Sequence, residues 1–323
     1  MLPAHIDPAH CIVTGQYAVY TPPMHEMIQQ IGDWIDQQTP GGYIAGASRL
    51  GKTKTVQWHL TDVLEERFHS SLPLVVWSHR PDSHKSESFF WHQLLAASHF
   101  EFLNPVRAPK KAEGIYLLQQ RLISIANHAR RNYVILLIDE AQDITYQEWK
   151  WLVGLQNQLD YEGCRLSVFS VGSHQLDYKH EYMASTGNAH VAARFMSAYF
   201  RFHGLRAENE LEYVLNAYDV DSEWPLGSGL SFLQYFAPGP YSSGRRLANI
   251  APLLWKALAE LSPSRTRKYR EFPMQHVAKV IEAALLQLAN GDDWEDVTSY
   301  ENWLDALAKV NFSDHMRIIS TAG

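Results

Sequence analysis

Residues 46–53 read GASRLGKT, and this stretch decides the fold of the chain. It matches the pattern GxxxxGK[ST], in which two glycines let the backbone wrap around an anion with its N–H groups pointing inward. The predicted phosphate loop consists of Gly46, Ala47, Ser48, Arg49, Leu50, Gly51, Lys52 and Thr53. We expect it to bind ATP, with Lys52 reaching the β- and γ-phosphates and the Thr53 hydroxyl ligating Mg²⁺. A chance match is the alternative, but an apolar stretch before the motif and a helical pattern after it favour a phosphate loop.

A second motif, YVILLIDE, lies downstream at residues 133–140. Its continuous apolar run predicts a central strand buried on both faces of a parallel sheet. The strand ends in two carboxylates, which a site that hydrolyses nucleotides needs. We expect Asp139 to hold Mg²⁺ and Glu140 to act as general base on the attacking water. The alternative is a core segment with a solvated acidic end.

The rest of the N-terminal two thirds alternates between strand and helix patterns. Apolar runs predict strands at 42–45, 74–77, 133–138, 165–171 and 199–203. Helical spacing predicts helices at 24–38, 53–69, 89–100, 114–131, 146–159 and 190–198. This alternation predicts an α/β fold, a P-loop nucleotide-binding domain whose parallel sheet is flanked by helices.

After residue 206 the strand patterns stop, and only helices are expected, at 208–217, 230–236, 245–261, 275–291 and 294–310. We therefore predict four parts. They are an N-terminal arm (1–23), the α/β nucleotide-binding domain (24–206), an all-α lid domain (207–262) and a C-terminal helical extension (263–323).

Polar residues at other element ends are candidates for the catalytic site. Ser173 follows the strand expected at 165–171 and could orient the attacking water; we favour it over Ser170, and a local turn hydrogen bond is the alternative. Arg194 precedes the last strand and could stabilise the transition state in a neighbouring subunit, with Arg201 as a weaker candidate. In the lid, Arg246, ahead of Arg245, could contact the γ-phosphate. For each arginine the alternative is an ordinary surface salt bridge or a solvated side chain.

The 323 residues carry a net charge of −7, so the protein cannot bind nucleic acid with its whole surface. Two local basic clusters could do so without reading sequence. One contains Arg107, Lys110 and Lys111; the other contains Arg265, Arg267, Lys268 and Arg270. A solvated charged loop is the alternative for each.

The remaining composition indicates a cytoplasmic protein. The two cysteines, Cys11 and Cys164, show no metal or disulfide spacing, so we expect reduced thiols. The histidines show no zinc-binding pattern. The first residues lack a secretory signal pattern, and no apolar run is long enough to cross a membrane.

The order of these motifs resembles that of the AAA+ ATPases over roughly residues 25–260. The sequence DEAQ at residues 139–142 is similar to the TniB/TnsC-type regulators of DNA transposition, and it also occurs in other bacterial AAA+ proteins. Lys52, Thr53, Asp139 and Glu140 match the family pattern directly. Ser173 departs from it, since Asn or Thr is more usual there.

The resemblance implies a homo-oligomer, a ring or a filament, that assembles on double-stranded DNA in the presence of ATP. It also implies that the oligomer links a target-selector protein to the transposase. The basic loop at 107–111 would face DNA, and the helices beyond 263 could dock the transposase. Two other functions stay open. One is a bacterial AAA+ ATPase that acts through protein contacts in secretion or signalling without DNA, and the other is a nucleotide-binding scaffold that hydrolyses ATP poorly.

Overall fold

The computed structural model describes residues 2–80, 86–263 and 271–322, and it divides the chain into two compact units. The first, here the helical unit, comprises Met1–Glu26, Ala47–Trp58 and His203–Gly323. The second, the sheet unit, comprises Met27–Gly46 and His59–Phe202. Each is described separately.

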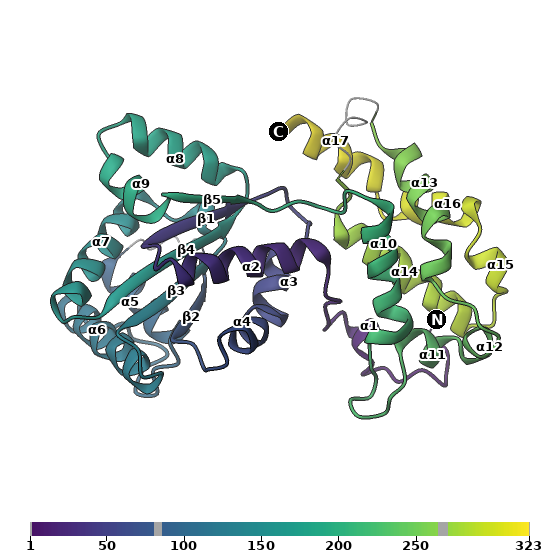
Figure 1. Cartoon of the computed structure of the whole chain (residues 1–323), viewed down its shortest axis with the longest axis horizontal. Helices are drawn as coiled ribbons and strands as arrows, with labels where there is room; N and C mark the ends of the chain where they lie inside the picture. The colour runs from purple at the N-terminus through teal and green to yellow at the C-terminus, as the bar shows by residue number, and fades with distance from the viewer. Residues whose placement is uncertain (1, 81–85, 264–270, 323) are drawn as a thin grey trace. The chain divides into compact units, whose positions relative to one another are not determined.

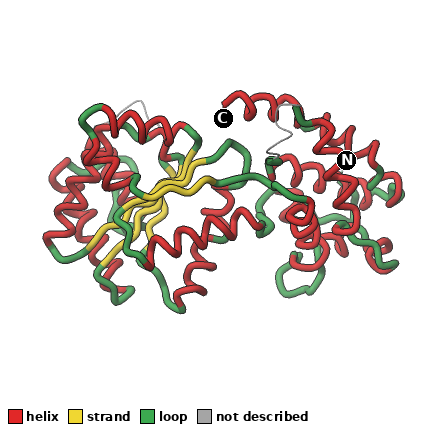
Figure 2. Tube along the Cα trace, turned by 45° about the horizontal axis from the view of Figure 1, so that its top comes forward, coloured by secondary structure: helices red, strands yellow, loops and turns green. Residues whose placement is uncertain are grey.

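The sheet unit contains five parallel strands in the order β2-β3-β4-β1-β5. Figure 2 shows them side by side as a twisted sheet between helices. The strands are β1 (Gly41–Ala45), β2 (Leu74–Ser78), β3 (Tyr133–Asp139), β4 (Arg165–Gly172) and β5 (Ala198–Arg201). All five correspond to predicted strands, with small differences at their ends. β3 is buried from Val134 to Asp139, as its continuous apolar sequence requires.

Among the described residues, seven α-helices and one 3₁₀ turn accompany the sheet. Figure 1 labels these α-helices. They are α2 (Pro22–Asp36), α4 (Leu60–Phe68), α5 (Glu87–Ala97), α6 (Lys111–His128), η1 (Ala141–Asp143), α7 (Tyr146–Tyr161), α8 (Gln175–Ser185) and α9 (Ala189–Phe195). Helices α5 to α9 share one hydrophobic core with alternate residues of β1 to β4. On the other face, Trp34 of α2 packs against Phe169 of β4, with ring centroids 5.4 Å apart.

The helical unit contains α1 (Cys11–Thr14), α3 (Lys52–Trp58), α10 (Glu208–Asn216), η2 (Ala217–Asp221), α11 (Phe232–Phe236), α12 (Pro238–Ser242), η3 (Ala248–Ile250), α13 (Ala251–Leu261), α14 (Met274–Ala289), α15 (Trp294–Val297), α16 (Tyr300–Lys309) and α17 (Phe312–Ala322). Its core draws on both ends of the chain. Ile6 and Ile12, from the predicted arm, belong to the same buried cluster as Leu254 of α13 and Trp303 of α16.

Several helices differ from the predicted ones. The helix predicted at 53–69 is interrupted at His59, where α3 ends and α4 begins. The helix predicted at 294–310 is divided because the Ser299 hydroxyl accepts a hydrogen bond from the Asn302 N–H and so starts α16. The helix predicted from residue 245 begins only at Ala251. Helices α8 and α17 were not predicted. No helix in the described part of the chain could span a bilayer.

Candidate nucleotide-binding site

The phosphate loop starts at the edge of the sheet where the parallel strands end. β1 pairs with β4 up to Ala45 and Gly172, and the Gly46 N–H then donates to the Gly172 carbonyl at 3.3 Å. β3 ends at the same edge in Asp139, one residue beyond the last β3–β4 pair. In open parallel sheets, ligands bind outside the carboxyl ends of the strands. The sheet unit therefore presents the beginning of the phosphate loop and the acidic strand end on one edge.

The glycines of the motif are required by the backbone. A Cβ at Gly46 would lie 2.3 Å from the Phe202 carbonyl oxygen, and Gly51 has φ +122°. Arg49 also has a positive φ, 64°, which costs a non-glycine residue about 1 kcal/mol or more. Thus the backbone itself explains both glycines of the motif: Gly46 is approached closely by a neighbouring carbonyl group, and Gly51 has a positive φ.

Lys52 is the first residue of α3, and its ammonium donates to the Ala47 carbonyl at 2.6 Å. The Lys52 side chain therefore points back towards the phosphate loop that precedes it in sequence. Thr53 follows in the first turn of α3 and is half-buried. The Lys52 ammonium is thus held against the loop backbone, and in a phosphate loop this lysine is the one that reaches the phosphates.

Two helices from the C-terminal part of the helical unit hold the middle of the loop. The Gln275 N–H at the start of α14 donates to the Arg49 carbonyl at 3.2 Å. Ser48 Oγ lies 3.4 Å from His315 Nε2 on α17, and His315 Nδ1 lies 2.8 Å from His276 Nε2. Burial lowers the pKa of His276 to about 4, helped by the neighbouring His315. Sequence reasoning missed this contact because residues 48 and 315 are far apart and neither belongs to a recognisable pair motif.

The acidic end of β3 is partly buried. Asp139 is 3% exposed, and its Oδ1 accepts the Glu140 N–H at 3.0 Å. Glu140 is exposed and has left-handed backbone angles, φ 58° and ψ 35°, which turn the chain sharply into η1. Its carboxylate accepts a hydrogen bond from Gln142 Nε2 at 2.7 Å. The two acidic residues therefore have distinct environments, one inside the sheet and one at the surface.

Ser170, within β4, and Ser173, directly after β4, differ in the same way. Ser170 is fully buried, and its hydroxyl has no hydrogen-bond partner among the described residues. Ser173 is half-buried, its hydroxyl accepts the Gln175 N–H at 3.3 Å, and its N–H donates to Gln142 Oε1 at 3.1 Å. The structure thus places Ser173 at the open end of the strand and Ser170 inside the core.

Arg194, Arg246 and Arg245 make polar contacts with other residues of their own unit. Arg194 donates to Gln156 Oε1 at 3.2 Å and to Asn157 Oδ1 at 2.6 Å, both on α7. Arg246 donates to the carbonyls of Tyr241 and Arg245 and lies over the Tyr241 ring. Arg245 pairs with Glu295. Arg201 is the last residue of β5 and is exposed.

The basic loop before α6 lies on the surface of the sheet unit. Arg107 and Lys110 are exposed and line a pocket of about 500 Å³. Lys111 is also exposed but pairs with Glu87 at 2.7 Å. The second predicted cluster, Arg265 to Arg270, lies outside the described residues.

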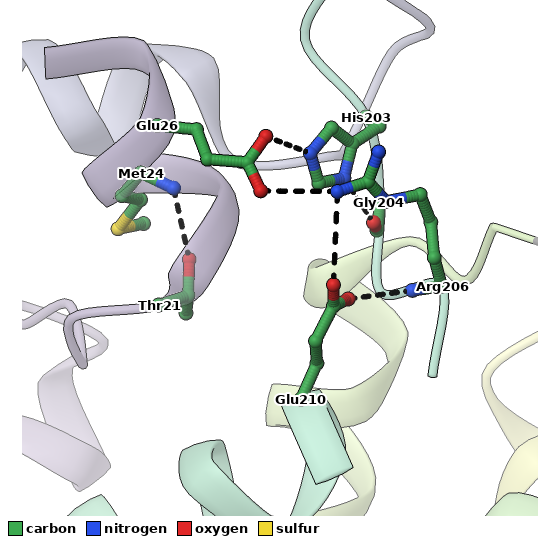
Figure 3. Close-up of polar contacts among 7 residues, drawn as sticks. All are labelled: Thr21, Met24, Glu26, His203, Gly204, Arg206 and Glu210. Carbon is green, nitrogen blue, oxygen red and sulfur yellow. Dashed lines mark hydrogen bonds and ion pairs between the residues drawn. The ribbon is translucent and has the colours of Figure 1, made fainter. Parts of the chain in front are cut away.

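A clasp within the helical unit, shown in Figure 3, also escaped prediction. Glu26 bonds to His203 Nε2 at 2.8 Å and to Arg206 at 3.0 Å. The Arg206 N–H donates to Glu210 Oε2 at 2.7 Å, and His203 Nδ1 lies 2.7 Å from the Gly204 carbonyl oxygen. These bonds connect Glu26, near the start of α2, to residues 203–210, the segment that follows β5.

The two expected magnesium ligands, Asp139 in the sheet unit and Thr53 in the helical unit, both offer oxygen atoms. No group of three or more His, Cys, Asp or Glu residues in the described ranges could hold a metal ion. Mg²⁺ in nucleotide sites typically takes one or two protein oxygens, with phosphate and water supplying the rest. A carboxylate at Asp139 and a hydroxyl at Thr53 are ligands of that kind.

Comparison with known proteins supports the fold. Residues 35–179 match the family described as an AAA domain. The Aeropyrum pernix ORC1 protein in complex with DNA is similar, at 12% identity and TM-score 0.56, over 96% of this chain and 71% of that chain. Drosophila ORC bound to DNA matches at 12% identity and TM-score 0.53, over 90% of this chain and 67% of that chain. No curated protein sequence matches. The chain has the AAA+ P-loop fold, a parallel sheet flanked by helices and followed by a helical region.

Proposed function

We propose that the protein is an ATP-dependent, DNA-binding AAA+ regulator of DNA transposition. The observation that carries the ATPase part is the direct continuation of β1 into residues 46–53. It occurs at the edge of the sheet where β3 ends in Asp139 and Glu140. This combination of loop and acidic strand end supports binding of ATP as its magnesium complex.

The proposed reaction is hydrolysis of the γ-phosphate. Water attacks the γ-phosphorus, the bond to the β-phosphate oxygen breaks, and Glu140 takes the proton that the water loses. Lys52 neutralises charge on the phosphates, and Thr53 and Asp139 would hold Mg²⁺, which would supply further positive charge. Ser173 orients the water from the end of β4. The products are ADP and phosphate.

Two arginines complete the proposed site. Arg246 contacts the γ-phosphate of its own subunit, and Arg194 reaches that of a neighbour in a ring or filament. Arg194 would first have to release Gln156 and Asn157, so we expect assembly and ATP to compete with those bonds. Mixing subunits tests the role in trans. An Arg194→Ala protein should regain turnover when it is mixed with Lys52→Ala subunits that carry the arginine. Absence of rescue despite normal assembly would refute this role.

The proposed DNA contact is formed by Arg107 and Lys110 of the exposed loop and by Lys111, the first residue of α6, which also pairs with Glu87. Three cations per subunit are few, but an oligomer repeats them along the duplex, which reconciles DNA binding with the net charge of −7. Binding should be independent of sequence and sensitive to salt. Through this ring or filament the protein would connect a target selector to the transposase. The resemblance of residues 139–142 to DEAQ-containing transposition regulators supports this step.

ATPase assays with duplex DNA distinguish this function from the main alternative, an AAA+ ATPase that acts only through protein contacts. We expect duplex DNA to stimulate hydrolysis and promote ATP-dependent assembly, visible by electron microscopy with a slowly hydrolysed analogue. Removing one loop cation, in Arg107→Ala or Lys110→Ala, should lower the slope of log affinity against log salt by about 1 per subunit. If duplex DNA changes neither the rate of hydrolysis nor the extent of assembly, the alternative is favoured.

A further inference from the structure

Gln142 connects the ends of two strands at the point where their pairing stops. The last paired residues of β3 and β4 are Ile138 and Ser170. Beyond them, the Gln142 side chain, in η1, spans the gap. Its Oε1 accepts the Ser173 N–H at 3.1 Å, and its Nε2 donates to Glu140 Oε2 at 2.7 Å. One amide thus links the residue expected to orient water with the residue expected to accept the water's proton.

The direction of this amide is fixed by its partners. A backbone N–H can only donate, so Oε1 must face Ser173. The Nε2 donors then face the Glu140 carboxylate, which can only accept when ionised. Nε2 also lies 3.4 Å from Asp143 Oδ2, a longer contact than the 2.7 Å bond to Glu140. The amide therefore favours one orientation of the exposed Glu140 carboxylate.

The strand beside Gln142 leaves room for it. A Cβ on Gly172, the last residue of β4, would lie 2.4 Å from Gln142 Oε1 and 2.8 Å from Leu176 Cδ1. Gly172 has no positive φ in this structure, so left-handed geometry does not explain the glycine. Close approach of the Gln142 and Leu176 side chains does.

We infer that Gln142 is a positioning residue that holds the Glu140 carboxylate ready for the attacking water and couples it to the end of β4. This inference rests on the proposed hydrolysis of ATP. It gives a role to Gln142, the fourth residue of the DEAQ sequence. The proposed contacts to phosphate and Mg²⁺ do not involve this residue. The opposite possibility, that the bond restrains Glu140 in an inactive orientation, predicts faster turnover when the bond is removed.

Gln142→Glu is the sharpest test, since it keeps the size and the acceptor for Ser173 N–H but replaces the donor with a repelling charge. We expect kcat to fall about 10-fold or more while KM for ATP changes less than about 2-fold, as for an interaction used only in the transition state. Gln147→Glu makes the same chemical change at an exposed position on α7 and should leave kcat unchanged.

Two further variants separate positioning from loss of structure. Gly172→Ala should displace Gln142 and lower kcat without any change at residue 142. Combining Gln142→Glu with Glu140→Gln should cost little beyond Glu140→Gln alone, because residues that act as a unit are not additive. Thermal unfolding and ATP binding should stay close to those of the wild type.

The outcomes distinguish this inference from the proposed function. Suppose that the wild type hydrolyses ATP and that Glu140→Gln abolishes turnover. If Gln142→Glu and Gly172→Ala then turn over ATP as fast as the wild type or faster, the role of Gln142 is overturned and the proposed function is not. A wild-type protein that does not hydrolyse ATP, or that is indifferent to Glu140→Gln, would overturn the proposed function and this inference with it.

Discussion

Acid should destabilise the helical unit through His10, a histidine enclosed by aromatic rings. The side chain is fully buried, and its ring centroid lies 4.7–5.4 Å from those of Trp224, Phe232, Tyr235 and Phe236. Its Nδ1 accepts the Ile12 N–H and caps α1, while Nε2 has no partner among the described residues. Burial lowers the pKa of His10 from 6.5 to about 4, and the charge of Asp7 opposes only part of this shift.

The sign and size follow from linkage. Between pH 6.5 and 4 the unfolded chain binds a proton at His10 and the folded chain does not. The stability that the neutral ring contributes is therefore complete above pH 6.5 and is lost as the pH falls towards 4. With these two pKa values, the loss between pH 7.5 and pH 5 is about 2 kcal/mol.

Urea unfolding at both pH values measures this loss. His10→Asn removes the titrating group but keeps a side chain that can cap α1. We expect the variant to be less stable than the wild type at pH 7.5, and to lose about 2 kcal/mol less than the wild type on going to pH 5. His69→Asn, at an exposed histidine, should not alter the wild-type pH dependence. Parallel losses in wild type and His10→Asn would refute the reasoning.

Substitutions at three further positions test the candidate site. Ser170→Ala removes a buried hydroxyl that has no partner among the described residues, so the free energy of unfolding should stay the same or rise by about 1 kcal/mol, with normal turnover. A clear drop in kcat would instead assign the orientation of the water to Ser170 and not to Ser173. Gly46→Ala places a methyl group 2.3 Å from a carbonyl oxygen, so calorimetry should show ATP affinity reduced about 10-fold or more; wild-type affinity would contradict the close approach. Arg49→Val puts a β-branched residue at φ 64°, so the free energy of unfolding in urea should fall by about 1–2 kcal/mol, whereas Arg49→Gly should not lower it. Equal stability of the two variants would contradict the left-handed geometry.

The central part of the fold could be predicted because its signals are local. The phosphate loop is a contiguous motif, and β3 is a continuous apolar run of the kind that is typical of a strand buried on both faces. Helix α8 was missed because only Leu176 and Met183 of its eleven residues are buried, which leaves little periodicity to detect. Helix α17 did carry a usable signal, since Phe312, Met316 and Ile319 are spaced for one helical face.

The missed parts of the site depend on contacts between distant residues. Ser48 meets His315 across 267 positions, and Glu26 meets His203 across 177. No local pattern marks either pair, and the histidines looked unremarkable without their partners. Gln142 was quoted in DEAQ, but its role depends on Ser173, which approaches it only when β3 and β4 lie side by side.

Calorimetric titration with ATP and Mg²⁺ tests the central claim, that residues 46–53 bind the triphosphate. The wild type should bind one ATP per chain. Lys52→Ala should weaken binding about 10-fold or more, because it removes a charge-assisted contact to the phosphates. Lys309→Ala, at an exposed lysine on α16, should bind as the wild type does. Equal affinity in Lys52→Ala and the wild type, or no binding by a folded wild type, would contradict the account.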